Sequence, residues 1–209
     1  MKLTDDDFTL FGLAPRHALD RAALDQRWRE LQGEVHPDRF AAEGAAAQRV
    51  AMQWAVRVNE AYQRLKDPLR RAAYLCELRG VPVDAERNTA MPGAFLMQQM
   101  SWREALDEAA DAAAVERIDA ERNTAMPGAF LMQQMNWREA LDDARDASAA
   151  ERIDDEVELA EKTLLADAAR KLDVDNDPAG AAADVRALMF VQRFREAVQH
   201  RLDVLDPTR

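Results

Sequence analysis

The sequence has little of what builds strands, disulfides or metal sites. Glycines number seven in 209 residues and β-branched runs are scarce, whereas Ala, Leu, Glu and Arg dominate, a composition that favours helices. The single cysteine, Cys76, excludes an internal disulfide and any multi-cysteine site, and we expect it to be a small buried apolar side chain. With 48% hydrophobic and 32% charged residues, the chain should be an ordered, all-α protein.

The sequence also has few positively charged residues relative to acidic ones, and it has no long apolar runs. The net charge of −11 excludes a general surface for nucleic acid or anionic membrane, because phosphate binding needs clustered Lys and Arg. No apolar run approaches the length of about 18 residues that a membrane helix needs, and the start lacks the pattern of a signal peptide. We therefore expect a cytoplasmic protein whose partners are other proteins, with no nucleic acid and no membrane among them.

Two helices are predicted on either side of the stretch EVHPDRF. Before it, apolar residues recur at helical spacing from Leu24 to Val35, and Asp20 can cap the start of the helix. After it, a second stripe is formed by Val50, Trp54, Val58, Ala61 and Leu65. The two stripes predict an antiparallel helical pair. The last helix, from about Ala181, should place another apolar stripe in a second helical region.

A segment of 35 residues occurs twice in succession. Residues 84–118 and 119–153 align without a gap, and 30 of the 35 positions are identical. The differing pairs are Ser101/Asn136, Glu108/Asp143, Ala110/Arg145, Ala113/Ser148 and Val115/Ala150. Solenoid arrays generally need about three or more units, so we interpret the repeat as a tandem duplication within an otherwise complete domain.

Each copy contains a helix with two apolar sides. Phe95 and Trp102 belong to an ordinary core stripe, whereas Leu96, Met97 and Met100 lie on the other side with Glu104 beside them. Large apolar side chains flanked by carboxylates are typical of a docking patch for a partner with basic groups. The spacing is equally consistent with another helix covering this side. The second copy repeats the set as Leu131, Met132, Met135 and Glu139.

The tripeptide His36–Pro37–Asp38 permits three interpretations. A metal site is disfavoured, because His17 and His200 are isolated and no second ligand cluster exists. A catalytic base is disfavoured as well, since no nucleophile or oxyanion donor pattern is nearby. A structural turn would suffice for an arbitrary tripeptide of this kind. We therefore expect no enzymatic activity.

The surroundings of the tripeptide carry a specific resemblance. The loop joins two predicted helices, and the residues that follow it include Asn59, Ala61, Tyr62, Leu65, Asp67–Pro68, Arg71 and Tyr74. Over residues 3–74 this pattern resembles the J domain of DnaJ-type co-chaperones. In that domain a His-Pro-Asp loop joins two antiparallel helices.

The rest of the chain is similar to one family of J-type co-chaperones. The stretches FTLFGL, RRAAYLCELRG, AFLMQQM-WREALD and VRALMFVQRFREAV resemble the HscB family of iron–sulfur cluster assembly. With one copy of the duplication removed, the resemblance runs essentially end to end. It implies a J domain that engages an HscA-type, DnaK-like ATPase, and a C-terminal three-helix bundle that holds an IscU-type scaffold protein.

The resemblance also implies two sets of site residues. His36, Pro37 and Asp38 would contact the chaperone ATPase, with Arg27 and Arg39 as supporting ionic contacts. The scaffold-binding set would be Leu96, Met97, Met100, Glu104, Leu131, Met132, Met135, Glu139 and Phe190. We expect no cofactor on this chain, because a cluster would belong to the scaffold.

Three features depart from the family pattern. The helix before the loop, usually basic in J domains, has Asp25, Glu30 and Glu34 among its arginines, which weakens its attraction for an ATPase. An acidic position of the patch is Ser101 or Asn136 here. The duplication adds a helix for which a three-helix bundle has no room. We favour copy two in the bundle and copy one as an added helix, with the reverse arrangement left open.

The resulting hypothesis has a J domain at 1–76, a linker at 77–94 and a helical bundle at 95–209. Such a chain would be a co-chaperone that stimulates ATP hydrolysis by an HscA/DnaK-type chaperone and delivers an IscU-type scaffold to it. Two alternatives remain: a general J-domain co-chaperone with a different client, and a helical adaptor without a chaperone link.

Overall fold

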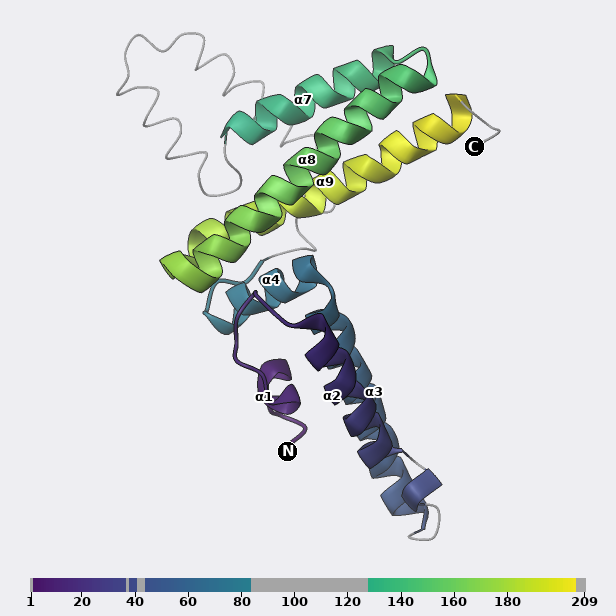
Figure 1. Ribbon diagram of the computed structural model, residues 1–209, viewed down its shortest axis with the longest axis vertical. Coiled ribbons are helices and arrows are strands. Elements are labelled where there is room, and N and C mark those ends of the chain that lie inside the picture. The colour runs from purple at the N-terminus through teal and green to yellow at the C-terminus, as the bar shows by residue number, and fades with distance from the viewer. Residues whose placement is uncertain (1, 37, 41–43, 84–127, 206–209) are drawn as a thin grey trace. The chain divides into compact units, whose positions relative to one another are not determined.

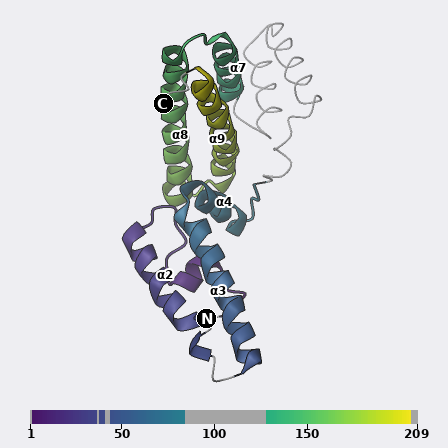
Figure 2. The same ribbon diagram turned by 90° about the vertical axis from the view of Figure 1, so that its right-hand side faces the viewer.

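The computed structural model describes residues 2–36, 38–40, 44–83 and 128–205. Every regular element in these ranges is a helix, which confirms the expected all-α class. The chain forms two compact units, whose helices are drawn in Figures 1 and 2. The first unit comprises Met1–Pro82 and Ala169–Pro178, and the second comprises Val83–Ala168 and Ala179–Arg209. None of the helices within the described ranges is long and apolar enough to cross a bilayer.

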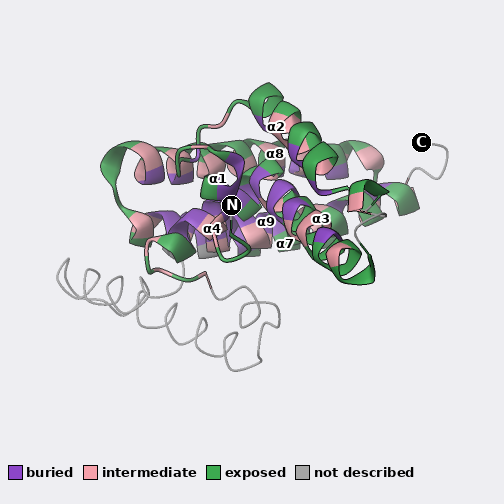
Figure 3. Ribbon diagram, turned by 90° about the horizontal axis from the view of Figure 1, so that it is seen from below, coloured by how far each residue is buried: buried purple, intermediate pink, exposed green. Residues whose placement is uncertain are grey.

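A helical hairpin forms the body of the first unit. Helix α2 spans Arg21–Val35 and helix α3 spans Ala45–Lys66, and the two lie side by side in both views (Figures 1 and 2). Their outer sides are largely exposed (Figure 3). The apolar residues between them are buried, as the antiparallel pairing of the two stripes predicts; they include Leu24, Leu31, Val58, Ala61 and Leu65.

Val50 does not belong to this core, and its inclusion in the predicted stripe is wrong. Its side chain is 51% exposed, and the first buried residue of α3 is Ala51. The reason is the unequal length of the two helices, 22 residues for α3 and 15 for α2. The 15 residues from Ala51 to Leu65 match the length of α2, so the earlier turns of α3 extend beyond their partner helix.

Side-chain caps fix where the helices of the first unit begin. The Asp20 carboxylate accepts a hydrogen bond from the backbone N–H of Ala22 at 2.8 Å, which confirms the predicted cap of α2. Asp67 caps helix α4, Pro68–Leu78, in the same way. The short helix α1, Asp7–Phe11, buries two phenylalanines and ends at Gly12, whose φ of 66° is the left-handed conformation that favours glycine at this position.

Residues 169–178 belong to the first unit, although they come almost one hundred residues after Pro82 in the chain. They contain a turn of π-helix, Lys171–Asp175. The Asp173 carboxylate accepts hydrogen bonds from the backbone N–H groups of His17 and Ala18, both at 2.7 Å. Leu172 is buried, and Arg79 donates to its carbonyl oxygen. The N-terminal loop before α2 is therefore held by a segment that no local sequence pattern links to it.

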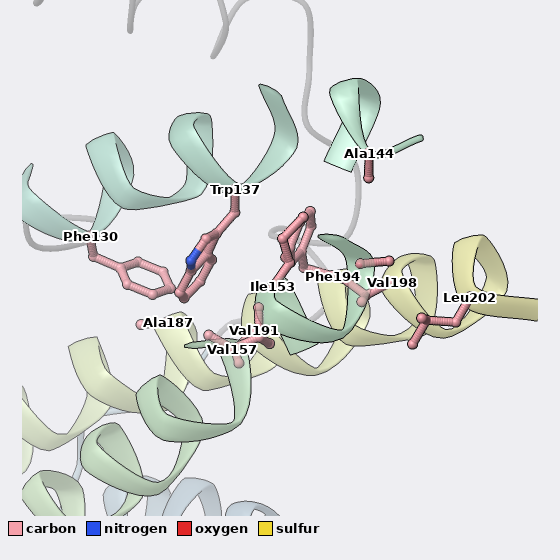
Figure 4. Packing of buried hydrophobic residues seen from close by; sticks show 11 residues of the cluster. Phe130, Trp137, Ala144, Ile153, Val157, Ala187, Val191, Phe194, Val198 and Leu202 are labelled. Atoms are coloured by element: carbon pink, nitrogen blue, oxygen red, sulfur yellow. The ribbon is translucent and has the colours of Figure 1, made fainter. Parts of the chain in front are cut away.

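In the second unit, the described residues form a bundle of three helices. Helix α7 spans Gly128–Asp143, α8 spans Ala147–Arg170 and α9 spans Pro178–Leu205. On α9, Arg195 lies within 3.0–3.2 Å of three carboxylates of α8, which ties these two helices together. The buried apolar cluster (Figure 4) consists of Phe130, Trp137, Ala144, Ala150, Ile153, Val157, Ala187, Val191, Phe194, Val198 and Leu202.

The second copy of the duplication supplies the first helix of this bundle. Phe130 and Trp137 of α7 are 6% and 2% exposed and point into the cluster (Figure 4). The preference for copy two in the bundle is therefore confirmed. Copy one, residues 84–118, lies outside the described residues, and so does the prediction that it forms an added helix.

Candidate functional sites

The first candidate site lies where α2 ends. His36 follows the last residue of α2 in an extended conformation, and residues 38–40 have a 3₁₀ conformation. Both side chains are exposed, that of His36 by 56% and that of Asp38 by 91%. Pro37 lies outside the described residues. The hairpin therefore presents an imidazole and a carboxylate to solvent.

The contacts of His36 argue against a catalytic dyad. The Nδ1 atom accepts a hydrogen bond from the backbone N–H of Asp38 at 3.3 Å. A nitrogen that accepts carries no proton, so the Asp38 carboxylate, 3.6 Å from the same atom, cannot accept a hydrogen bond from it. Asp38 thus does not orient the imidazole as the acid of a triad orients its base. An exposed imidazole of this kind is suited to contact with another protein.

The two supporting arginines are engaged within the first unit. Arg39 donates to the carbonyl oxygen of Gly33 at 2.9 Å, which joins the loop to the last turns of α2. Arg27 lies 3.1 Å from a carboxylate oxygen of Glu30 and 3.7 Å from one of Glu34. Any ionic contact that these residues make with a partner would have to compete with the internal ones.

The acidic residues of α2 offset its arginines in the way that the sequence indicated. Arg21 pairs with Asp25 at 2.7 Å, one turn along the helix. Hydrogen bonds from Gln26 and Arg27 lower the pKa of Glu30, so this carboxyl stays charged to a lower pH. The helix therefore offers an approaching partner a surface on which positive and negative charges largely compensate each other.

The second candidate site lies on α7. Met132 and Met135 are 53% and 44% exposed, and Glu139 is exposed beside them. Among the described residues, no other helix covers these two methionines. The side chain of Leu131, which lies within α7, and the whole copy-one set of Leu96, Met97, Met100 and Glu104 are outside the described residues.

Phe190 of α9 connects this surface to the core. It is half-buried, and its ring lies 6.1 Å from that of Phe130 in an edge-to-face arrangement and 6.2 Å from that of Phe194 in a stacked one. Trp137 extends the cluster by stacking on Phe194 at 5.8 Å. Of these four rings Phe190 is the least buried, so the aromatic core reaches the surface at this residue. The patch formed by Met132, Met135, Glu139 and Phe190 is called the α7 patch below.

Arg138 is a residue of this surface that the sequence argument missed. Its guanidinium carbon lies 5.5 Å from the centre of the Phe190 ring, in a cation–π contact. The spacing contained a signal, because Arg138 follows Met135 by three residues and so shares its side of the helix. In the described part of the chain, His, Cys, Asp and Glu form no group of three or more that could hold a metal ion.

Comparisons with known proteins agree with this architecture. A family model described as the HSCB C-terminal oligomerisation domain matches residues 91–126 and again 126–199, so the match begins anew near the second copy. Over 206 residues the chain is 44% identical to the co-chaperone protein HscB homolog of Burkholderia mallei, with 99% of both chains covered. A homolog from Cupriavidus taiwanensis is 60% identical over 117 residues, 56% of this chain and 66% of the relative.

Solved structures show the same fold. Chaperone HscB from Vibrio cholerae is 31% identical, and the similarity covers 96% of this chain and all of the other with a TM-score of 0.68. Human co-chaperone protein HscB has a TM-score of 0.70 at 22% identity over 96% of this chain and 83% of the other.

A helical hairpin with His36 and Asp38 exposed after its first helix, combined with a separate three-helix bundle, defines a J-domain co-chaperone. The relative that is 44% identical over nearly the full length and the matching family model then specify the family of J-domain co-chaperones. The chain belongs to the HscB family. It is a co-chaperone and not an enzyme, and this membership decides against the helical adaptor.

Proposed function

We propose that the first unit stimulates ATP hydrolysis by an HscA-type, DnaK-like chaperone and that the second unit delivers an IscU-type scaffold to it during iron–sulfur cluster assembly. His36, Pro37 and Asp38 would contact the ATPase and favour its hydrolysing state, with Arg27 and Arg39 in support. The action of the loop on the ATPase would be allosteric, with the scaffold and the ATPase bound to the chain at the same time. These encounters would take place in the cytoplasm.

The observation that carries this proposal is the exposure of two separate surfaces on two separate units. Among the described residues, nothing covers the solvent-facing sides of His36 and Asp38. In the described part of the bundle, the methionines of the α7 patch are exposed, whereas the other large apolar side chains are mostly buried. An exposed apolar surface next to carboxylates fits a protein partner better than a small substrate.

Methionine and phenylalanine suit the docking of a folded scaffold. Methionine is flexible and polarizable, so it adapts to a partner surface, and Phe190 adds a ring that its neighbours hold in place. Copy one has the same residue types at the corresponding positions, Met97, Met100 and Glu104. The proposed scaffold-binding set therefore keeps Leu96, Met97, Met100, Glu104 and Leu131 beside the residues of the α7 patch.

Calorimetric titration of an IscU-type scaffold into the full chain tests the proposal. Saturable binding at about one scaffold per chain would indicate that one copy works, and about two would indicate that both do. A scaffold that binds should also increase the ATPase rate of the chaperone together with this chain. Absence of binding at two temperatures, with ATPase stimulation intact, would point to a J-domain co-chaperone with a different client.

A further inference from the structure

Arg138 is the single cation of helix α7. The helix has the sequence GAFLMQQMNWREALDD, in which this arginine stands among three carboxylates. It is exposed, and its guanidinium lies over Phe190, 5.5 Å from the ring centre. A positive charge is thus set beside the apolar part of the α7 patch, in a chain whose net charge is −11.

The contact with Phe190 leaves the polar edge of the arginine available. A guanidinium is planar and attracts an aromatic ring through its face, while its five N–H donors lie in the plane and point outward. Within the described part of the chain, no hydrogen bond or ion pair engages these donors. Arginine presented in this way can bind a carboxylate through two parallel hydrogen bonds.

The guanidinium of Arg138 is also partly pre-organised for binding. Phe190 is held edge-to-face by Phe130 and in a stack by Phe194, so the surface on which the guanidinium rests is fixed by the core. A side chain that already has a favoured place loses less rotamer freedom when a partner binds. Two arginines of α2, Arg21 and Arg27, are instead paired with carboxylates of their own helix.

We propose that Arg138 is a specificity-determining residue of the α7 patch, whose guanidinium, seated on Phe190, forms an ion pair with a carboxylate of the scaffold. The inference rests on the proposed function and adds to it. A partner would then need apolar groups opposite Met132 and Met135, basic groups opposite Glu139, and an acidic group opposite Arg138. Charges of opposite sign at neighbouring points fix the register of a docked protein and disfavour other partners.

The test is the affinity of the full chain for an IscU-type scaffold, measured by calorimetry at two salt concentrations. Copy one repeats the residue as Arg103, so both positions are changed together, as Arg103→Glu with Arg138→Glu and as Arg103→Gln with Arg138→Gln. We expect the glutamate variant to raise the Kd about tenfold or more and the glutamine variant to raise it less. The difference in Kd between the glutamate and glutamine variants should be smaller at high salt, because salt screens exposed charges.

A matched control is Arg152→Glu, which makes the same change of charge at an exposed position of α8; its Kd should stay within about twofold of the unchanged chain. Circular dichroism checks that each variant is folded. If both paired variants bind like the unchanged chain, Arg138 has no role in docking. Equal, salt-independent losses for Glu and Gln would mean that the residue only holds Phe190, which overturns the ion pair. If the unchanged chain itself does not bind, the proposed function fails and the inference fails with it.

Discussion

The carboxylate of Asp7 is completely buried and lies 2.7 Å from the guanidinium of Arg57. Its Oδ2 atom accepts a hydrogen bond from Arg64 at 2.8 Å, whereas Oδ1 faces Arg57 without the alignment of a hydrogen bond. The backbone N–H of Asp7 donates to the hydroxyl of Tyr74 at 3.0 Å. One residue of α1 therefore links α1 to both α3 and α4.

Replacing Asp7 by alanine should lower the free energy of unfolding of the first unit. Removing the carboxylate leaves two arginines without their partner, but Arg57 and Arg64 are 21% and 43% exposed and can be partly solvated. We therefore expect a loss of about 2–3 kcal/mol, below the full cost of an unpaired buried charge. Urea denaturation followed by tryptophan fluorescence, to which Trp28 of the first unit contributes, measures this loss. Glu60→Ala, at an exposed site of α3, is the control, and equal midpoints for the two variants would contradict the prediction.

His17 should make the stability of the first unit depend on pH. Burial, and then the nearby Arg71, lower the pKa of His17, so the unfolded chain binds a proton more readily than the folded one. Stability is then complete above the ordinary histidine pKa of about 6.5 and decreases as pH falls below it. In His17→Gln, which retains an N–H for the Pro68 carbonyl, this decrease should be smaller. Urea denaturation of the unchanged chain and of His17→Gln at pH 7 and pH 5.5 measures this difference. If the stability of the two proteins falls equally between these pH values, His17 does not cause the pH dependence.

His36→Gln should abolish stimulation of an HscA-type ATPase. The imidazole is exposed and makes no long-range contact with the other residues that the structure describes, so neither the fold nor scaffold binding should change. The expected result is an ATPase rate at the level of the chaperone alone in a steady-state phosphate-release assay. His200→Gln makes the same substitution at an exposed position of α9 and should stimulate normally. Full stimulation by the His36 variant would remove the loop from the mechanism.

Truncating the methionines of the α7 patch should weaken scaffold binding. Met132→Ala and Met135→Ala, combined with the same changes at Met97 and Met100, remove apolar area that a partner would bury. We expect a loss of about 1–2 kcal/mol for each residue that is a hot spot, seen as a higher Kd in calorimetry. Leu159→Ala removes a comparably exposed apolar side chain from α8, and it should bind like the unchanged chain. Similar affinities for patch and control variants would place the scaffold elsewhere.

Deleting residues 84–118 should leave the bundle intact. The core that surrounds α7 is built from copy two, α8 and α9, and the deletion joins residue 83 to a segment that starts with the same sequence. The thermal midpoint of the deleted chain should stay within a few degrees of the full chain, since about 1 kcal/mol corresponds to several degrees in a domain of this size. Scanning calorimetry measures it. An unfolded or aggregated product would show that copy one supports the bundle.

Local patterns in the sequence were sufficient for the helices and for the two candidate sites. Asp20 caps the helix that it was expected to cap, because a carboxylate next to the first turn satisfies free backbone donors wherever it occurs. The apolar stripes predicted the pairing of α2 with α3. The second stripe of the duplicated helix identified Met132 and Met135 as a candidate patch, but its spacing did not decide whether another helix covers them. The prediction that Val50 is buried was wrong, because an apolar stripe indicates which face of a helix is apolar but not how long the partner helix is.

The sequence by itself thus determined the all-helical class, the duplication, the His-Pro-Asp loop and the resemblance to HscB proteins, since each depends on residue type and short-range spacing. Only the tertiary structure decided which copy enters the bundle, because both copies have the same core-facing Phe, Trp and Leu. The short connection from α7 to α8, Ala144–Asp146, lets copy two fold back on α8. The contacts of Asp173 with His17 and of Arg138 with Phe190 likewise join residues far apart in the chain, and no local pattern specifies such pairs.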